Sequence, residues 1–204
     1  MKFNDLNIIF EDGDVIVCEK PSGILSEGEG SMVDILGEHT EQVFCVHRLD
    51  RETSGLMVYA KTSAAAASLS EQIRDSKFEK EYLALIEGAP EQDSGSFEDM
   101  LFYDRAKNKS FVVKGNKARR GVKRALLEYL VVSRGDGSSV VRVKLHTGRT
   151  HQIRVQFASR GMPLVADRRY GAKPSEQKTF SLRACAISFY HPKTKEKMNF
   201  ELDA

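Results

Sequence analysis

The chain has 204 residues, of which 41% are hydrophobic and 29% charged, a composition typical of a soluble globular protein. No apolar run approaches the about 20 residues that a membrane-spanning helix needs, and the N-terminus lacks a secretory signal pattern. The three cysteines are an odd number without a CxxC pair, which argues against a disulfide framework or a zinc site and favours a reducing cytoplasm.

The net charge of +2 conceals an asymmetry between the halves of the sequence. Residues 1–104 carry 8 Lys and Arg against 22 Asp and Glu, a net charge of −14, whereas residues 105–204 carry 23 against 7, a net charge of +16. Arg105–Arg124 holds nine cations, no acid and the aromatic Phe111. It is either a solvated, flexible loop or a surface for RNA, whose bases can stack on aromatic rings. Its candidate RNA-binding cations are Lys117, Arg119 and Arg120.

The acidic half opens with a predicted hairpin. Asn7–Phe10 and Val15–Glu19 are β-branched runs on either side of the turn signal Glu11-Asp12-Gly13-Asp14, and a short helix follows them. Gly55–Lys61 predicts a further strand.

An alanine-rich helix is expected at Ser63–Ser76, with Thr62 or Ser63 as its N-cap. Lys80–Glu87 alternates as a strand does, and Ala89–Ser96 is a linker rich in Pro, Gly and Ser. Because this linker lies close to the charge switch, we expect two lobes divided near residues 89–104.

The basic half predicts four strands and a helix. The strands are Ala125–Val132, Val140–Leu145, Leu182–Phe189 and Met198–Leu202, and Thr150–Ser159 has helical spacing. The expected fold class is therefore α+β, with a mixed, mainly antiparallel sheet in two lobes, a few flanking helices and an active-site cleft between the lobes.

Two segments concentrate reactive side chains without the spacing of an apolar core. HRLDRETSGL (His47–Leu56) lies between strand-like runs and is typical of a functional loop, although Asp50 alone would more often be a turn or cap residue. LHTGRTHQIRV (Leu145–Val155) passes from a strand into a helix, where Arg154 alone would more often be a surface cation.

Five motifs, in the same order, resemble those of the RluA/TruC-type pseudouridine synthases, whose catalytic pattern reads HRLDxxTSG. Besides HRLDRETSGL they are EDGDVIVCEKPSGI, KEYLALIEG, TGRTHQIRV with PLVADRRYG, and HPKTKEKMNFE. The resemblance covers nearly the whole chain. It implies one catalytic domain over residues 1–204, without a separate N-terminal RNA-binding domain.

What the resemblance implies is an isomerase that converts uridines of rRNA or tRNA to pseudouridine, as a cytoplasmic monomer without cofactor, metal or membrane contact. Asp50 would be the catalytic aspartate, Tyr82 the ring that stacks on the target base, and Arg154 the partner of the Asp50 carboxylate. Arg48 would help to displace the flipped nucleotide, and Ile153 would line the base pocket. The remaining expected substrate-binding residues are His47, Thr53 and Arg149.

Three positions depart from the family pattern. Gln156 stands where the family often has His, Ala166-Asp167 where Gly-Asp is usual, and Arg183 where His is common. We expect activity to survive these changes, with altered substrate contacts near Gln156.

Two alternatives remain at this stage. A metal-dependent nuclease or phosphoesterase could draw ligands from His47, Asp50, His146, His151 and Asp167, but the sequence has no HExxH signature or tight carboxylate cluster. A non-catalytic RNA-binding module of the same fold would not need Asp50, Tyr82 and Arg154 together.

Overall fold

The computed structural model describes residues 2–115, 120–177 and 180–202. The chain forms two compact units, the first comprising Met1–Lys80 and Arg183–Ala204 and the second Glu81–Leu182. The chain thus changes unit within two strands. The segment near 89–104, where the sequence predicted the division, lies inside the second unit.

The first unit is built on a mixed sheet. β1 (Asn7–Glu11), β2 (Val15–Lys20), β4 (Ser54–Ala60) and β10 (Leu182–Tyr190) follow one another across it. Two shorter strands extend it, since β3 (Phe44–Cys45) pairs with β4 and β11 (Lys197–Glu201) with β10. Each pairing is antiparallel except that of β4 with β10, which confirms the predicted mixed, mainly antiparallel sheet.

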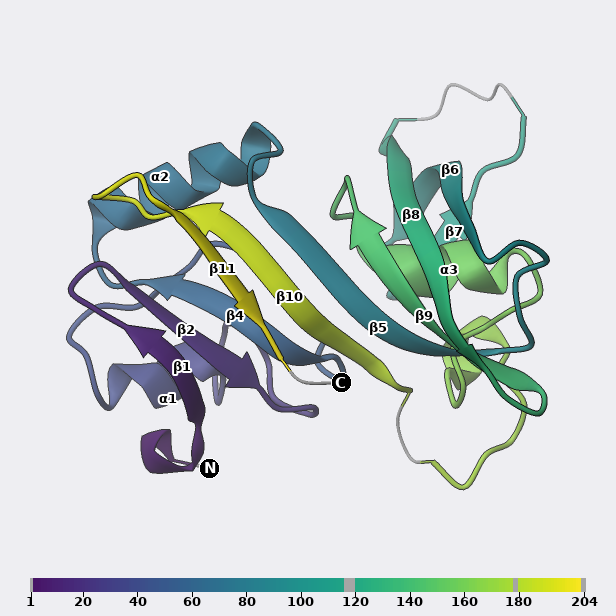
Figure 1. Ribbon diagram of the computed structural model, residues 1–204, viewed down its shortest axis with the longest axis horizontal. Helices are drawn as coiled ribbons and strands as arrows, with labels where there is room; N and C mark the ends of the chain where they lie inside the picture. Colours follow the sequence, from purple (N-terminus) through teal and green to yellow (C-terminus); the bar gives the residue numbers. More distant parts are fainter. Residues whose placement is uncertain (1, 116–119, 178–179, 203–204) are drawn as a thin grey trace. The chain divides into compact units, whose positions relative to one another are not determined.

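The longest helix of this unit packs against the sheet (Figure 1). α2 (Ser63–Arg74) begins at its predicted cap, where Thr62 Oγ1 accepts a hydrogen bond of 3.1 Å from Ala65 N. It buries Leu69 in a core shared with residues of β2, β4 and β10. Burial of one such leucine stabilises the fold by about 1.5–3 kcal/mol. The shorter helices of this unit are α1 (Met32–Gly37) and η1 (Phe3–Asp5).

The second unit holds an antiparallel sheet with the order β5 (Glu79–Glu87), β9 (Ser138–Leu145), β8 (Val122–Arg134), β6 (Ser94–Asp104) and β7 (Lys109–Val112). α3 (Gln152–Ala158) lies across one face of it (Figure 1), with Phe157 packed edge-on against Phe97 at 5.1 Å between ring centroids. η2 (Arg168–Tyr170) packs beside α3, with Tyr170 in the same core as Val155.

Two features differ from the sequence expectation. The strand β6 is not predicted, because its inward positions include Gly95 and Asp99 and its apolar alternation is weak. Arg105–Arg124 is not a single loop, since β7 and the start of β8 occupy part of it. Their hydrogen bonds to β6 override the weak local strand signal.

Within the described residues, no helix is both long enough and apolar enough to cross a bilayer. Cys18 and Cys185 are buried, Cys45 is half-buried, and all three are free thiols. Burial raises the pKa of Cys18 to about 12, so this thiol stays protonated and acts as a small apolar core residue.

Candidate active site

Asp50 lies in the loop between β3 and β4 of the first unit. The loop turns tightly at this residue, where Thr53 N donates to the Asp50 carbonyl oxygen at 3.0 Å. The motif glycine that follows, Gly55, has φ +113°, and a Cβ there would stand 2.2 Å from the carbonyl oxygen of Ala184. Only glycine permits this approach of β4 to β10, which fixes the end of the Asp50 loop.

A buried lysine ties this loop to the turn after β2. The Nζ of Lys20, which is 0% exposed, donates to the carbonyl oxygens of Pro21 at 2.8 Å, Ile24 at 2.7 Å and Arg51 at 3.0 Å. Burial lowers the pKa of Lys20 to about 8, although the carboxylates of Glu52 and Asp50 oppose the change.

Further hydrogen bonds join the same two segments. Ser22 Oγ donates to the Glu52 carbonyl oxygen at 2.8 Å, and Leu49 N donates to Ser26 Oγ at 3.0 Å. The loop that carries Asp50 is therefore held by side chains of residues 20–26 (KPSGILS), most of which belong to the motif EDGDVIVCEKPSGI.

Two predicted substrate-binding residues of this loop face the interior of the first unit. His47 Nε2 accepts a hydrogen bond of 3.2 Å from Val58 N, and its ring lies 5.1 Å from that of Phe78. Burial, together with the charge of Lys80, holds the pKa of His47 well below its usual range, so the ring is neutral. Thr53 is 2% exposed. His47 therefore joins the loop to β4, and the side chains of both residues lie in the interior.

Arg48 has the opposite placement. Its side chain is 70% exposed and lies 3.2 Å from a carboxylate oxygen of the partly exposed Glu27. Such an ion pair is worth at most about 1 kcal/mol, so the guanidinium can exchange this partner for a phosphate or a base.

In the second unit, β5 carries Tyr82 on the same strand face as Ala84 and Ile86, and all three are buried. Tyr82 is 5% exposed and stands opposite Val143 of β9. Alternation along the strand therefore fixes the direction of the ring, as the sequence pattern indicated.

Arg154 lies on α3 and has a carboxylate partner within its own unit. Its Nε is 2.6 Å from Asp167 Oδ2 and its Nη2 is 2.9 Å from Asp167 Oδ1, a bidentate pair in which Arg154 is 5% and Asp167 1% exposed. Aromatic rings flank the guanidinium, with its Cζ 4.2 Å from the Phe180 centroid and 5.0 Å from that of Tyr170. Sequence reasoning missed these partners, although Asp167 stood in a motif it had noted.

Two of the three departures from the family pattern lie at constrained positions in the second unit. Ala166, where glycine is usual, has φ +67° and so occupies a left-handed conformation directly before Asp167. Gln156 is 0% exposed, and its Nε2 donates to the Phe97 carbonyl oxygen at 3.1 Å and to Asp99 Oδ2 at 2.8 Å. It thus joins α3 to β6 in the interior.

The remaining predicted residues are spread over the second unit. Ile153 is 4% exposed, and Arg149 donates from Nε to the Arg124 carbonyl oxygen at 2.8 Å. Arg120 is exposed, whereas Lys117 and Arg119 lie outside the described residues.

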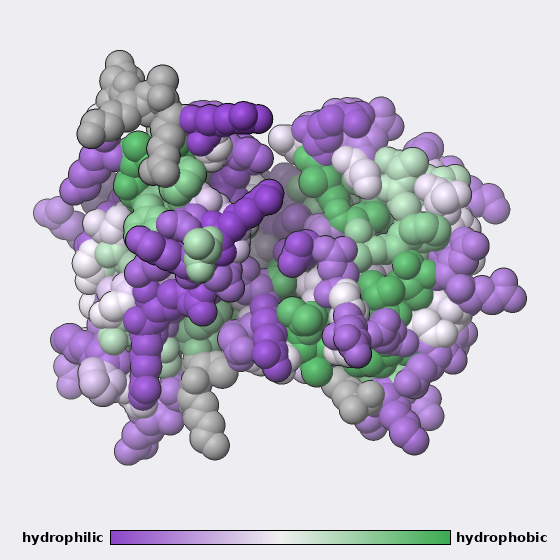
Figure 2. All heavy atoms as spheres, turned by 180° about the vertical axis from the view of Figure 1, so that it is seen from behind, coloured by the Kyte–Doolittle hydropathy of each residue, from purple (hydrophilic) through white to green (hydrophobic). Residues whose placement is uncertain are grey.

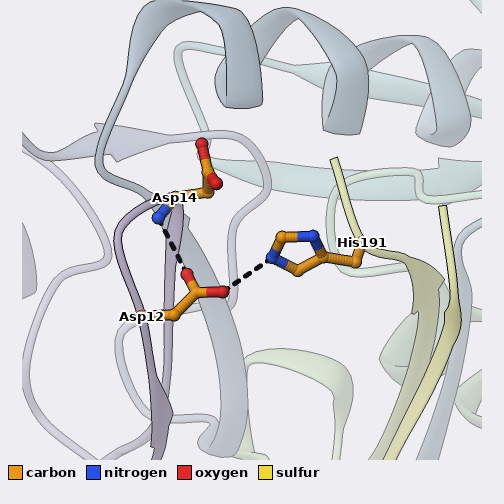
Figure 3. A group of neighbouring side chains, drawn as sticks. All are labelled: Asp12, Asp14 and His191. Atoms are coloured by element: carbon orange, nitrogen blue, oxygen red, sulfur yellow. Dashed lines mark hydrogen bonds and ion pairs between the residues drawn. The ribbon is translucent and has the colours of Figure 1, made fainter. Parts of the chain in front are cut away.

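In the described ranges, one group of side chains is close enough together to hold a metal ion (Figure 3). It comprises Asp12, Asp14 and His191, whose possible ligand atoms all lie within 4.8 Å of one another. His191 Nδ1 accepts from Thr194 N at 3.1 Å, so its Nε2 carries the proton and donates to Asp12 Oδ2 at 2.8 Å. Although burial opposes it, backbone N–H donors and His191 lower the pKa of Asp12. The hydrogen bond between His191 and Asp12 therefore joins the turn after β10 to the turn after β1.

At least four of the five residues of the metal-nuclease alternative contact other side chains or backbone groups of the protein. His47 accepts from Val58 N, His146 lies 3.0 Å from Glu128, His151 lies 2.9 Å from the Tyr170 hydroxyl, and Asp167 binds Arg154. These contacts leave the alternative without support from the site geometry.

Comparison with known proteins identifies the family. The profile described as RNA pseudouridylate synthase matches residues 14–159. An uncharacterized RNA pseudouridine synthase of Aquifex aeolicus (strain VF5) is 39% identical in an alignment over 223 residues. The alignment covers 97% of this chain and 69% of that protein. The dual-specificity RNA pseudouridine synthase RluA of Vibrio vulnificus (strain CMCP6) is 37% identical over 200 residues, 92% of this chain and 78% of that protein.

A solved structure shares the fold. The solved structure of human RNA pseudouridylate synthase domain containing 1 superposes with a TM-score of 0.85 at 23% identity, covering 100% of this chain and 85% of that chain. The sequence resemblance and the shared fold agree, and the chain belongs to the RluA-type family of RNA pseudouridine synthases.

Proposed function

We propose that this isomerase converts uridines of a structured rRNA or tRNA to pseudouridine, with Asp50 as the catalytic carboxylate and without a cofactor. The observation that carries the proposal is the Asp50 loop, which Ser26 contacts just before Asp50, and Lys20 and Gly55 hold just after it, within a sequence that matches the family. A loop so constrained presents one carboxylate in one geometry.

The reaction needs such a group because it breaks a strong bond and forms another. The C1′–N1 bond of the uridine breaks, the uracil turns, and a C1′–C5 bond forms, while C5 loses its hydrogen and N1 gains a proton. Asp50 acts either as the nucleophile at C1′ or as a base that opens a route through a sugar-derived intermediate. Both routes require the ionised carboxylate, which a neighbouring cation favours.

The other roles follow from the family resemblance. Arg154 is proposed as the cation that pairs with Asp50, Tyr82 as the ring that stacks on the uracil and retains it once detached, and Arg48 as the side chain that helps to displace the flipped nucleotide. Flipping costs a few kcal/mol in a duplex and less in a loop, so a loop uridine is the favoured target. We propose that the enzyme acts as a monomer in the cytoplasm, and the three free thiols support a reducing compartment.

The test is release of tritium from C5 of uracil in RNA taken from cells that lack this protein. We expect wild type to release tritium in the presence of EDTA, and Asp50→Asn to be slower by a factor on the order of 10⁴ or more. Asp136→Asn, in an exposed turn of the second unit, is the matched control and should keep the wild-type rate.

Release by Asp50→Asn at the wild-type rate would exclude the proposed role of this carboxylate. Salt-sensitive RNA binding by wild type without tritium release would instead identify the chain as a binding module for that RNA pool.

A further inference from the structure

Two groups stand out among the cations of the second unit. Arg124, Arg134, Arg142 and Arg160 each lie 2.5–2.9 Å from a carboxylate oxygen, and Arg154 is paired with Asp167. The other group comprises Arg105, Lys107, Lys109, Arg168 and Arg169. Throughout the described ranges, none of these five lies within ion-pair distance of a carboxylate.

The five cations come from two segments that are distant in the sequence but adjacent in the fold. Arg169 Nη1 donates to the Asn108 carbonyl oxygen at 2.5 Å, and Ser110 N donates to the Tyr170 hydroxyl at 2.8 Å. The Nζ of Lys109 lies 5.0 Å from the centroid of the Tyr170 ring. The turn between β6 and β7 therefore lies against η2, and the cations of both segments share one surface.

This surface also carries an exposed aromatic ring. Phe111 is 37% exposed, and the ammonium groups of Lys107 and Lys109 lie 5.8 and 5.7 Å from its centroid. The face seen in Figure 2 shows long hydrophilic side chains projecting from the molecule around smaller apolar areas. A ring flanked by cations matches a nucleobase flanked by phosphates.

Electrostatics makes a polyanion the fitting partner. Five positive charges held close together, none of them in an ion pair of the described residues, repel one another, and phosphates would reduce this repulsion while releasing the counterions of the RNA. The backbone of the turn is ordered by Lys107 N, which donates to Asp104 Oδ1 at 3.1 Å, and by Tyr103, whose hydroxyl donates to Asn108 Oδ1 at 2.7 Å. The charges are therefore presented on a defined surface.

We propose that the β6–β7 turn and η2 form one docking surface for an unpaired stretch of the substrate RNA, an inference that rests on the proposed function. Arg105, Lys107, Lys109, Arg168 and Arg169 bind consecutive phosphates, and Phe111 stacks on a base between them. This places η2, which contributes nothing to the sequence-predicted basic stretch, in the RNA-binding surface.

The test measures the affinity for substrate RNA at several salt concentrations with full-length protein. Lys107→Gln/Arg168→Gln removes one charge from each segment and should reduce the slope of log K against log salt by about 1.4, since each contact to single-stranded RNA contributes about 0.7. The matched control Arg74→Gln/Lys77→Gln removes two exposed charges from the first unit and should keep the wild-type slope.

A second variant tests the stacking. Phe111→Ala should weaken RNA binding about fivefold or more at every salt concentration, with an unchanged slope. A slope for Lys107→Gln/Arg168→Gln equal to that of wild type, or an equal fall in both double variants, overturns the proposal. Unchanged affinity of Phe111→Ala overturns the stacking.

Binding and chemistry are measured separately, so the two proposals can fail separately. Tritium release by wild type together with an unchanged slope in Lys107→Gln/Arg168→Gln would reject the docking surface and leave the isomerase. A reduced slope without any tritium release would support the surface and reject the proposed reaction.

Discussion

In the first unit the loop of Asp50 is held through a buried ammonium, whereas in the second unit Arg154 is held through a buried carboxylate. Lys20 binds the Asp50 loop through a hydrogen bond to the carbonyl oxygen of Arg51, and although burial lowers the pKa of its ammonium group, the negative charge of Asp50 acts to raise it. Arg154 is bound directly by both oxygens of Asp167. Asp50 and Arg154 thus each have an opposite charge in their own unit, which offsets part of the cost of removing them from water.

The two arrangements differ in what a mutation would leave behind. Loss of Asp167 leaves a guanidinium buried without its carboxylate, while loss of Lys20 leaves neutral carbonyl groups without donors. Because removing a carboxylate from a buried charge costs more than removing a donor from a neutral carbonyl group, the second unit should be the more sensitive.

The largest effect is therefore expected for Asp167→Asn. It should lower the free energy of unfolding by about 3–5 kcal/mol, measured by urea denaturation, and should slow tritium release. Asp93→Asn, which removes the exposed partner of Arg134, should cost less than about 1 kcal/mol. Equal costs for the two variants would refute the importance assigned to the buried pair.

Lys20→Met should have the next largest effect. Because it removes three hydrogen bonds to carbonyl oxygens, we expect a loss of about 2–4 kcal/mol in the free energy of unfolding. Tritium release at saturating RNA should also fall, since the Asp50 loop loses its support. The exposed Lys77→Met is the control, and a Lys20→Met protein as stable and active as that control would contradict the assigned role.

The pH dependence of stability sharpens the comparison. Lys20 has a folded-state pKa of about 8 against an ordinary value of 10.5, so between these pH values the folded state has lost the proton that the unfolded state keeps. The free energy of unfolding should therefore rise with pH in this window, by up to about 1.4 kcal/mol per pH unit.

Lys80, whose pKa burial also lowers to about 8, contributes with the same sign. The difference between wild type and Lys20→Met isolates the contribution of Lys20. If the two proteins show the same pH slope between 8 and 10.5, the ammonium of Lys20 is not the group assigned here.

The smallest expected effect is an increase in the free energy of unfolding. Ala166→Gly relieves the left-handed strain before Asp167 and should raise the free energy of unfolding by about 0.5–1 kcal/mol. The control Ala66→Gly, inside α2, should lower it by about 1 kcal/mol. A loss of stability in Ala166→Gly would mean that the alanine side chain contributes packing that outweighs the strain.

Much of the local structure could be predicted from the sequence. The Thr62 cap starts α2 where it was expected, and the β-branched runs of β1 and β2 flank the predicted turn. These features depend on neighbours within a few residues, so the local sequence contains the information they need. The weak strand β6 was missed because its place is decided by pairing with β8 and β7.

The sequence by itself determined the family, the fold class and the candidate residues Asp50, Tyr82 and Arg154, because short motifs in a fixed order carry that information. Tertiary structure alone decided the interior place of His47, the pairing of Arg154 with Asp167, and the meeting of η2 with the β6–β7 turn. Each of these depends on burial or on contacts between distant segments. Charge and hydrogen-bond partners at such places follow from packing, which residue spacing along the chain does not record.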